Sequence, residues 1–364
     1  VPYTEAGYGF RQNIYKPKYD TQESIYADLI DQVKEGISLL NADKPAIEGD
    51  LFYNGDIDQW KKFGNSLLLR LGMRLSKVKP ELAAATAKAA IEGGIMSEAK
   101  DMCRLKHIAG GRDEDKNPVA LRFQKDNYIG QGKVKISQTF MNHLQATNDP
   151  RIAVFCSLKD GNADPSIQKG LPNGYDKNTI STNSDYTGKL EDYSNFNTNV
   201  ILREDAPTLL LMPSESKLLQ AEAALRNWVA GDPEALYKEA ICLSMQEQKE
   251  AYGVSISEKQ VNDYLAQNLF ANAASQEEKL EVLGNEYWVT TFMNGYESYA
   301  NWRRCGYPKL TPTHYAGNES NGQIPRRLPY AIDEYTINKA NVEQAVQQQG
   351  ADNLNTRIWW DVAK

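Results

Sequence analysis

The residues best suited to ligand binding lie in one polar stretch, residues 170–199, where aromatic rings alternate with amides and carboxylates. The candidates in this stretch are Tyr175, Asn183, Asp185, Tyr186, Tyr193 and Phe196. A sugar has flat apolar faces bordered by hydroxyl groups, so a ring beside amides and carboxylates offers both stacking and hydrogen bonds. Tyr315, in the polar segment 313–322, is a further candidate. The alternative is that these rings fix a long loop to the rest of the protein.

Tryptophan also provides stacking surfaces, and four tryptophans need a separate interpretation: Trp60, Trp228, Trp288 and Trp302. Each lies in a segment with helical spacing of apolar residues, which favours packing in the core over ligand contact. We also expect four arginines to be structural, either pairing with carboxylates such as Glu297 or capping helix ends. These are Arg303, Arg304, Arg326 and Arg327.

Metal, nucleophile and phosphate motifs are incomplete in this sequence. Asp160, Asn162 and Asp164 have the spacing of the first ligands of a calcium loop, but Pro165 and Leu171 replace the glycine and glutamate that such a loop needs. His107, His143 and His314 have no metal-ligand spacing and adjoin no nucleophile motif. Gly110 and Gly111 form no phosphate loop. We therefore predict no catalytic residue, metal or cofactor.

Composition narrows the class of protein. The chain has 364 residues, a net charge of −7 and 41% hydrophobic residues, and its apolar runs are too short to cross a bilayer. The acidic balance argues against a nucleic-acid partner. We interpret the four cysteines, which form no C-x-x-C, as mainly buried free thiols. The first residue is Val1, so we expect a processed product, an expression form or the ordered remainder of something longer.

Two pairs of predicted helices organise the chain. Residues 213–246 give one pair: Pro213 starts a helix that Gly231 ends, and Asp232 caps a second helix. Residues 56–94 repeat this pattern, with helices that start at Asp56 and Pro80. The spacing also predicts helices over 20–40, over 136–144, over 275–304 with a bend at Gly295, and over 338–346. The pairs look like tetratricopeptide units, which bury their apolar faces by stacking.

Between these helices the chain is irregular. Helical periodicity fades over residues 97–207, where Gly, Asn, Asp, Ser and Tyr accumulate, and residues 308–364 are loop-rich. Long loops held by a rigid scaffold are often functional, so we place the site in 97–207. The adjacent Trp359 and Trp360 predict that the end of the chain is docked.

Several phrases together resemble the SusD/RagB family of outer-membrane nutrient-binding lipoproteins. They are Gly55–Ser76, Asn148–Ile152, Ala221–Trp228, Gly295–Pro308, Ile324–Tyr330 and Ile358–Asp361. The resemblance implies a mainly α SusD-like fold, in which tetratricopeptide-like pairs (20–94 and 213–306) form the scaffold and 97–207 and 308–364 form the ligand site and packing segments. It further implies one domain over 1–364, with the N-terminal part of the family fold, the signal peptide and the lipidated cysteine missing.

The same resemblance implies a function. It suggests non-catalytic binding of a nutrient, most often an oligosaccharide, on the surface of a Bacteroidetes-type bacterium. The expected partner is a SusC-like TonB-dependent outer-membrane barrel, with the outer membrane reached through a lipid anchor. Two alternatives stay open: a glycoside hydrolase, which needs two carboxylates across a cleft, and a tetratricopeptide adaptor that binds a peptide on its helices.

Overall fold

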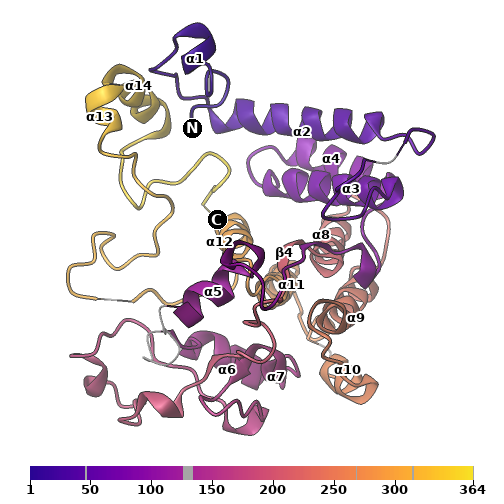
Figure 1. Cartoon of the computed structure of the whole chain (residues 1–364), viewed down its shortest axis with the longest axis vertical. Coiled ribbons are helices and arrows are strands. Elements are labelled where there is room, and N and C mark those ends of the chain that lie inside the picture. The colour runs from indigo at the N-terminus through magenta and orange to yellow at the C-terminus, as the bar shows by residue number, and fades with distance from the viewer. Residues whose placement is uncertain (46, 126–133, 268, 314, 364) are drawn as a thin grey trace.

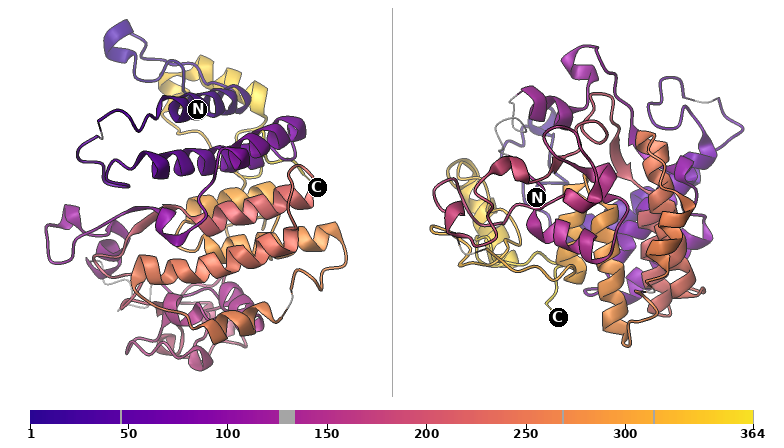
Figure 2. Two further views of the ribbon diagram at one scale, coloured as in Figure 1. Left: turned by 90° about the vertical axis from the view of Figure 1, so that its right-hand side faces the viewer. Right: turned by 90° about the horizontal axis from the view of Figure 1, so that it is seen from below.

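The computed structural model describes residues 1–45, 47–125, 134–267, 269–313 and 315–363, and helices dominate these residues (Figure 1). The mainly α class predicted from the sequence is confirmed. The longer helices lie in stacked layers (Figure 2), and the first of them runs across the direction of most of the later ones (Figure 1). They are α2 (Gln22–Leu39), α3 (Ile57–Arg74), α4 (Pro80–Glu92), α8 (Pro213–Leu225), α9 (Pro233–Tyr252), α11 (Gln276–Thr290), α12 (Gly295–Cys305) and α14 (Lys339–Gln349).

Shorter elements lie between and beyond these helices. The short helices are α1 (Gly9–Gln12), α5 (Pro118–Lys125), α6 (Gln138–Ala146), α7 (Ile152–Phe155), α10 (Glu258–Leu265) and α13 (Glu334–Ile337). Strands β1 (Cys103–Leu105) and β4 (Thr208–Leu211) pair antiparallel, with Cys103 opposite Leu211. Strands β2 (Cys156–Ser157) and β3 (Asn195–Phe196) also pair antiparallel, with Cys156 opposite Phe196. The helix predicted over 136–144 is α6, whereas α5 and α10 were not predicted.

The first helix pair forms as its sequence predicts. The carboxylate of Asp56 accepts a hydrogen bond from the Gln59 backbone N–H at the start of α3, and Pro80 is the first residue of α4. The two helices pack closely because α3 carries Gly72, where a Cβ would lie 2.8 Å from the Thr86 side chain of α4. This close packing leaves no room for a larger residue at position 72.

The second pair, α8 and α9, differs from the prediction at one end. Asp232 caps α9 as expected, but α8 already ends at Leu225. Asn227 adopts a left-handed conformation (φ 60°), which turns the chain before Gly231. Trp228 therefore lies in the connection, packed against the core with the Arg226 guanidinium over its ring.

The stretch predicted as one bent helix over 275–304 is two helices. α11 ends at Thr290 and α12 begins at Gly295, and the connection contains Met293 in a left-handed conformation (φ 74°). Asn294 caps α12 by accepting a hydrogen bond from the Glu297 N–H. The prediction of a simple bend was wrong, because a side-chain cap and a left-handed residue make a full break.

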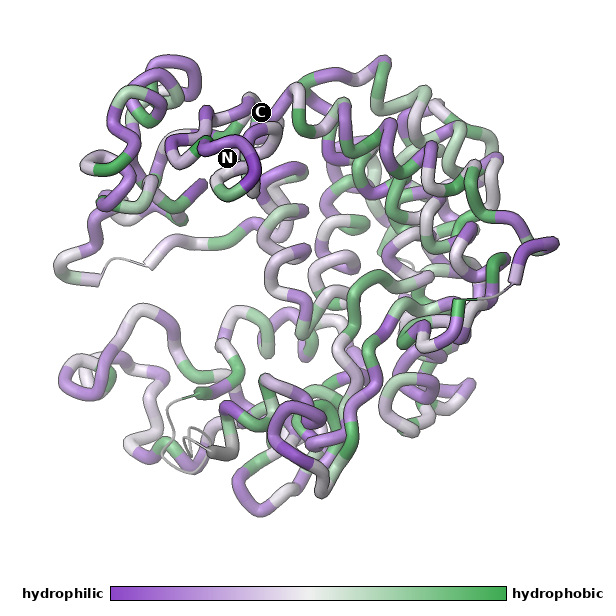
Figure 3. The backbone as a smooth tube through the Cα atoms, turned by 45° about the horizontal axis from the view of Figure 1, so that its top comes forward, coloured by the Kyte–Doolittle hydropathy of each residue, from purple (hydrophilic) through white to green (hydrophobic). Residues whose placement is uncertain are grey.

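The main core lies between the stacked helices, whose sequences alternate between hydrophobic and hydrophilic residues (Figure 3). A second apolar cluster fills the loop-rich middle segment around Phe140, Phe155 and Phe292. Trp360 is 3% exposed and belongs to the main core, so the C-terminal tail is docked as predicted. Among the described helices, none is both long enough and apolar enough to cross a bilayer.

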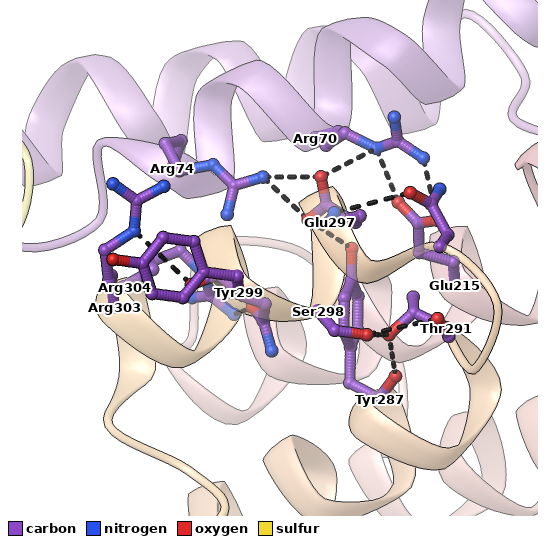
Figure 4. Close-up of polar contacts among 12 residues, drawn as sticks. Arg70, Arg74, Glu215, Tyr287, Thr291, Glu297, Ser298, Tyr299, Arg303 and Arg304 are labelled. Carbon is purple, nitrogen blue, oxygen red and sulfur yellow. Dashed lines mark hydrogen bonds and ion pairs between the residues drawn. The ribbon is translucent and has the colours of Figure 1, made fainter. Parts of the chain in front are cut away.

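Buried charges join the helices to one another (Figure 4). Arg70 of α3 binds Glu215 of α8, and Arg74 of α3 donates two hydrogen bonds to Glu297 of α12 at 2.6 and 2.8 Å. Tyr287 donates to the same Glu297 carboxylate. From the sequence we expected Glu297 to pair with the C-terminal arginines. The structure corrects this expectation, because its partners are Arg74 and Tyr287.

The four arginines singled out in the sequence have other partners. Arg304 binds Glu222, Arg326 lies 3.4 Å from Asp361, and Arg327 binds Asp352. Arg303 donates to the Arg326 carbonyl and covers the ring of Tyr299. Their structural role is as predicted.

Candidate functional site

A cavity of about 370 Å³ lies where the loop-rich middle segment meets the C-terminal tail and α11. In Figure 1 the chain that follows α12 runs past α6 and the loops after it on the left-hand side. The apolar part of the wall consists of Trp288, Leu310, Pro312, Ile324 and Pro325. The polar side chains of the wall are all neutral: Ser137, Thr139, Asn173, Thr311, Thr313, Asn318 and Gln323.

Trp288 provides the large aromatic surface of this cavity. The edge-to-face contact with Phe140 (ring centroids 4.9 Å apart) and the His143 ring fix one side of the indole. The side chain stays partly exposed and lines the cavity. A held ring with one open face is a suitable platform for stacking.

The sequence interpretation assigned Trp288 to the core. The structure shows that the side chain packs on the core and also lines the cavity. Tyr287 belongs to the buried stripe of α11, and the next residue points about 100° further around a helix. Asn285, one turn before Trp288 on α11, is likewise partly exposed. This offset from the stripe was the signal that could have identified the residue.

Two segments meet at this cavity: the loop around Gly174 and the part of the C-terminal tail around Tyr315. Gly174 packs so closely on the tail that a Cβ would lie 2.8 Å from the Thr313 side chain. Tyr315 donates a hydrogen bond of 2.8 Å to the Asp176 carboxylate. This bond, followed by those from Asn178 and Thr179, lowers the pKa of Asp176 to about 2. The carboxylate is therefore a charged latch between the two loops.

None of the predicted site residues is among the described wall residues, but three of them adjoin the wall through the chain or through a hydrogen bond. Tyr175 and Tyr315 are 41% and 45% exposed, on the two loops that meet at the Asp176 latch. Asp185 accepts a hydrogen bond of 3.0 Å from Gln138, which lies between the wall residues Ser137 and Thr139. Asn183 accepts from the Asp185 N–H and so shapes that turn.

Two of the predicted rings are engaged by contacts within the protein: Tyr193 is buried, and Phe196 is partly buried and packed on other rings. Tyr193 is 2% exposed, and its hydroxyl group donates to the Asp185 carbonyl and accepts from the Thr187 N–H. Phe196 packs edge-to-face on Phe123 and stacks on Phe292. Both rings anchor the loop from beneath, which is the alternative that the sequence left open. Tyr186 stacks on Tyr193 with ring centroids 5.8 Å apart and stays partly exposed.

A larger cavity, about 620 Å³, lies beside the connection between α2 and α3. Apolar surface predominates in its wall, with side chains such as Leu39, Ile47 and Leu51. Asp50 there accepts hydrogen bonds from Trp60 and from backbone N–H groups, so its carboxylate is occupied. The smaller cavity offers more neutral polar groups beside an open ring and is the better candidate site.

The remaining chemical motifs have structural roles. Asp160, Asn162 and Asp164 each accept a hydrogen bond from a backbone N–H two residues ahead. Within the described residues, no group of three His, Cys, Asp or Glu side chains could hold a metal. His107 contacts Thr208, burial lowers the pKa of His143, and His314 lies outside the described residues.

The cysteines are free thiols. Cys103, Cys156 and Cys305 are buried, whereas Cys242 on α9 is partly exposed. Three of the four thiols are therefore buried, in agreement with the prediction that the cysteines are mainly buried.

The chain matches the SusD-like family described as "Starch-binding associating with outer membrane" over residues 1–331. Among curated proteins, none matches this chain. A solved structure titled as a chitin-binding protein is similar over the whole chain and 76% of its own length, with 32% identity and a TM-score of 0.85.

Two further solved structures are similar. A chitin-binding SusD homologue from Flavobacterium johnsoniae shares 26% identity (TM-score 0.81), and the match covers all of this chain and 77% of that protein. A SusD homologue from Bacteroides uniformis shares 27% identity (TM-score 0.81) with the same coverage. This chain belongs to the SusD-like family.

Proposed function

We propose that this protein binds a neutral oligosaccharide in the cavity beside Trp288 and does not cleave it. The observation that carries the proposal is the composition of the wall, which combines one open indole face with hydroxyl and amide side chains. Sugars need this combination, because rings stack on their apolar faces while hydroxyl and amide groups bond to their edges. The relatives titled as chitin-binding support a carbohydrate ligand.

The charge of the wall supports a neutral ligand. None of the described side chains that line the cavity is charged, and Asp176, in the latch beside it, is an anion. A sulfated or uronic glycan would bring negative charge next to this carboxylate without a cation in the wall to compensate it. Fragments of chitin or starch fit these conditions.

The same wall argues against the alternative of a glycoside hydrolase. Hydrolysis needs two carboxyl groups across the bond, one of them an acid with a raised pKa. The described wall residues include no Asp or Glu, and the pKa of the neighbouring Asp176 is lowered. We therefore propose a binding protein and not an enzyme.

Tyr175, Asp185, Asn183, Tyr186 and Tyr315 are proposed as the rim of the site. The exposed rings of Tyr175 and Tyr315 would extend the stacking surface of Trp288 toward a second sugar unit. The peptide-adaptor alternative is less well supported, because such an adaptor binds its peptide on helices. Most of the wall comes from loops, and among the described wall residues Trp288 comes from a long helix.

The wider role follows from the family. We propose that the whole chain is one domain, that its helix pairs are tetratricopeptide-like units, and that the protein delivers its glycan to a SusC-like TonB-dependent barrel. We also propose a position at the cell surface, attached to the outer membrane through a lipid anchor. Co-purification of the full-length protein with such a barrel from outer membranes tests the partnership.

Isothermal titration tests the binding proposal directly. Chitooligosaccharides, maltooligosaccharides and an oligogalacturonate of equal length should be titrated into the protein, followed by an assay for new reducing ends. The proposal predicts binding of a neutral series, weaker or no binding of the acidic one, and no new reducing ends. Equal binding of the acidic glycan, or sustained release of reducing ends, would contradict it.

A further inference from the structure

A second polar cavity, about 230 Å³ in volume, shares no wall residue with the first. It is formed where the start of α2, the end of α14 and the C-terminal tail meet, and Figure 1 shows α14 beside the first turn of α2. Trp359 and Tyr330 supply its aromatic surfaces. No comparison assigns a role to it.

The charged groups around this cavity are already paired. Asp20 accepts hydrogen bonds from the backbone N–H groups of Tyr3 and Thr4, and Glu23 binds Lys79 at 2.8 Å. Arg357 binds Asp361 at 2.6 Å. These pairs leave little net charge to attract an ionic ligand, because each charge has its counterpart or its donors nearby.

The groups that remain available are neutral amides. Gln348 and Gln349, at the end of α14, line the cavity and make no side-chain hydrogen bond to another described residue. The Oε1 atom of Gln22 is buried at the same place without a partner among the described residues. A buried acceptor of this kind is normally satisfied by a donor, so the cavity has an unfilled requirement for an O–H or N–H group.

Trp359 completes a stacking site. Its ring contacts Tyr26 at a centroid distance of 6.4 Å, and the side chain stays partly exposed at the cavity. Tyr330 is held by Tyr19 and by the Arg327 guanidinium, so it forms a fixed wall. The second cavity therefore resembles the first in chemistry: it offers an aromatic ring and three amides, and its described charged groups are paired.

We propose that this second cavity binds a single neutral sugar unit, independently of the cavity beside Trp288. Its volume lies below the range of about 300–1,000 Å³ typical of sites for larger ligands, which favours one ring over a chain. The proposal takes its ligand class from the proposed function, but its geometry rests on different residues. A second contact of this kind would let the protein hold a branched or long glycan at two points.

The test uses saturation-transfer NMR with glucose and N-acetylglucosamine as the probes. In Trp288→Ala, which removes the platform of the first cavity, the monosaccharide signal should persist. Adding Gln348→Ala and Gln349→Ala should abolish that signal, whereas adding Gln347→Ala, an exposed neighbour outside the cavity wall, should leave it unchanged. The glutamine variants lie at a partly exposed helix end, so circular dichroism should show an unchanged fold.

The outcomes separate this proposal from the proposed function. If the wild-type protein binds oligosaccharides but Trp288→Ala gives no monosaccharide signal, the second site is refuted and the first stands. If oligosaccharides do not bind, but a monosaccharide signal depends on Gln348 and Gln349, the first site is refuted and the second stands. If the monosaccharide signal is unchanged by Gln348→Ala and Gln349→Ala, the second site is refuted.

Discussion

The helical frame and the cavity wall use polar side chains in opposite ways. In the frame and where it meets the middle segment, polar groups are charged, buried and paired, as in Arg151 of the middle segment, which is fully buried between Asp149 and Glu286 of α11. In the wall beside Trp288, polar groups are neutral and line open space. Charges fix helices in one arrangement because an unpaired buried charge is costly, whereas neutral groups exchange water for ligand hydroxyls at low cost.

The largest predicted effect comes from breaking a buried charge cluster. Arg151→Ala leaves Asp149 and Glu286 without their cation, so the free energy of unfolding should fall by about 3–5 kcal/mol. Arg112→Ala is the control, because Arg112 pairs with Asp115 at the surface, where solvent screens the pair, so its loss should lower the stability much less. Chemical denaturation measures both. Equal losses would contradict the claim that buried, paired charges fix the arrangement of the helices.

The second prediction concerns Glu247, a buried carboxyl group of the frame that accepts hydrogen bonds from Ser214. Burial raises the pKa of Glu247 from 4.5 to about 7. The folded state therefore binds the proton more tightly than the unfolded chain. The stability that this group provides is fully present below about pH 4.5 and is lost as the pH rises through about 7.

Glu247→Gln tests this dependence, because an amide keeps both contacts with Ser214 without a charge. Above about pH 8 the variant should be more stable than the wild type by up to about 3 kcal/mol, and below about pH 4 the two should agree. Denaturant unfolding across this range measures the difference. A difference that does not vary with pH would contradict the prediction.

The third prediction concerns the cavity wall. Trp288→Ala should weaken binding of the neutral oligosaccharide by at least about tenfold, because the stacking surface is removed. Trp228→Ala is the matched control: its ring packs on the frame, so it should lower stability and leave affinity unchanged. Titration calorimetry gives both affinities. Equal affinities for the two variants would exclude Trp288 from the site.

The smallest predicted effect comes from the latch. Tyr315→Phe removes the hydrogen bond to Asp176 and keeps the ring, so affinity should change by about threefold or less. The pKa of Asp176 should rise from about 2 toward its usual range, since the largest cause of its lowering is lost. An NMR pH titration of the carboxyl carbon measures this. An unchanged pKa would show that the latch is not closed in solution.

The frame was largely predictable because its signals are local. Asp56, Asp232 and the prolines at 80 and 213 mark helix starts whatever the helices pack against. The helix ends were less predictable. The break before Gly295 depends on Met293 in a left-handed conformation, and no sequence pattern predicts that conformation for methionine.

The site was harder to predict because cavity walls depend on tertiary contacts. Tyr175 and Tyr193 lie in one polar stretch with similar neighbours, yet one is 41% exposed and the other is 2% exposed. The folded loop separates them, because it buries Tyr193 through hydrogen bonds to Asp185 and Thr187 and through stacking on Tyr186. Trp288 carried a local signal, its offset from the buried stripe, but the partners from the tail that complete its cavity lie beyond any local pattern.

A crystal structure of the protein soaked with chitooligosaccharide or maltooligosaccharide tests the central claim most directly. The account predicts an intact glycan with one sugar ring stacked on the open face of Trp288 and its hydroxyl groups bonded to wall residues such as Asn173 and Gln323. A glycan bound elsewhere with this cavity empty, or a cleaved glycan between two carboxylates, would contradict it.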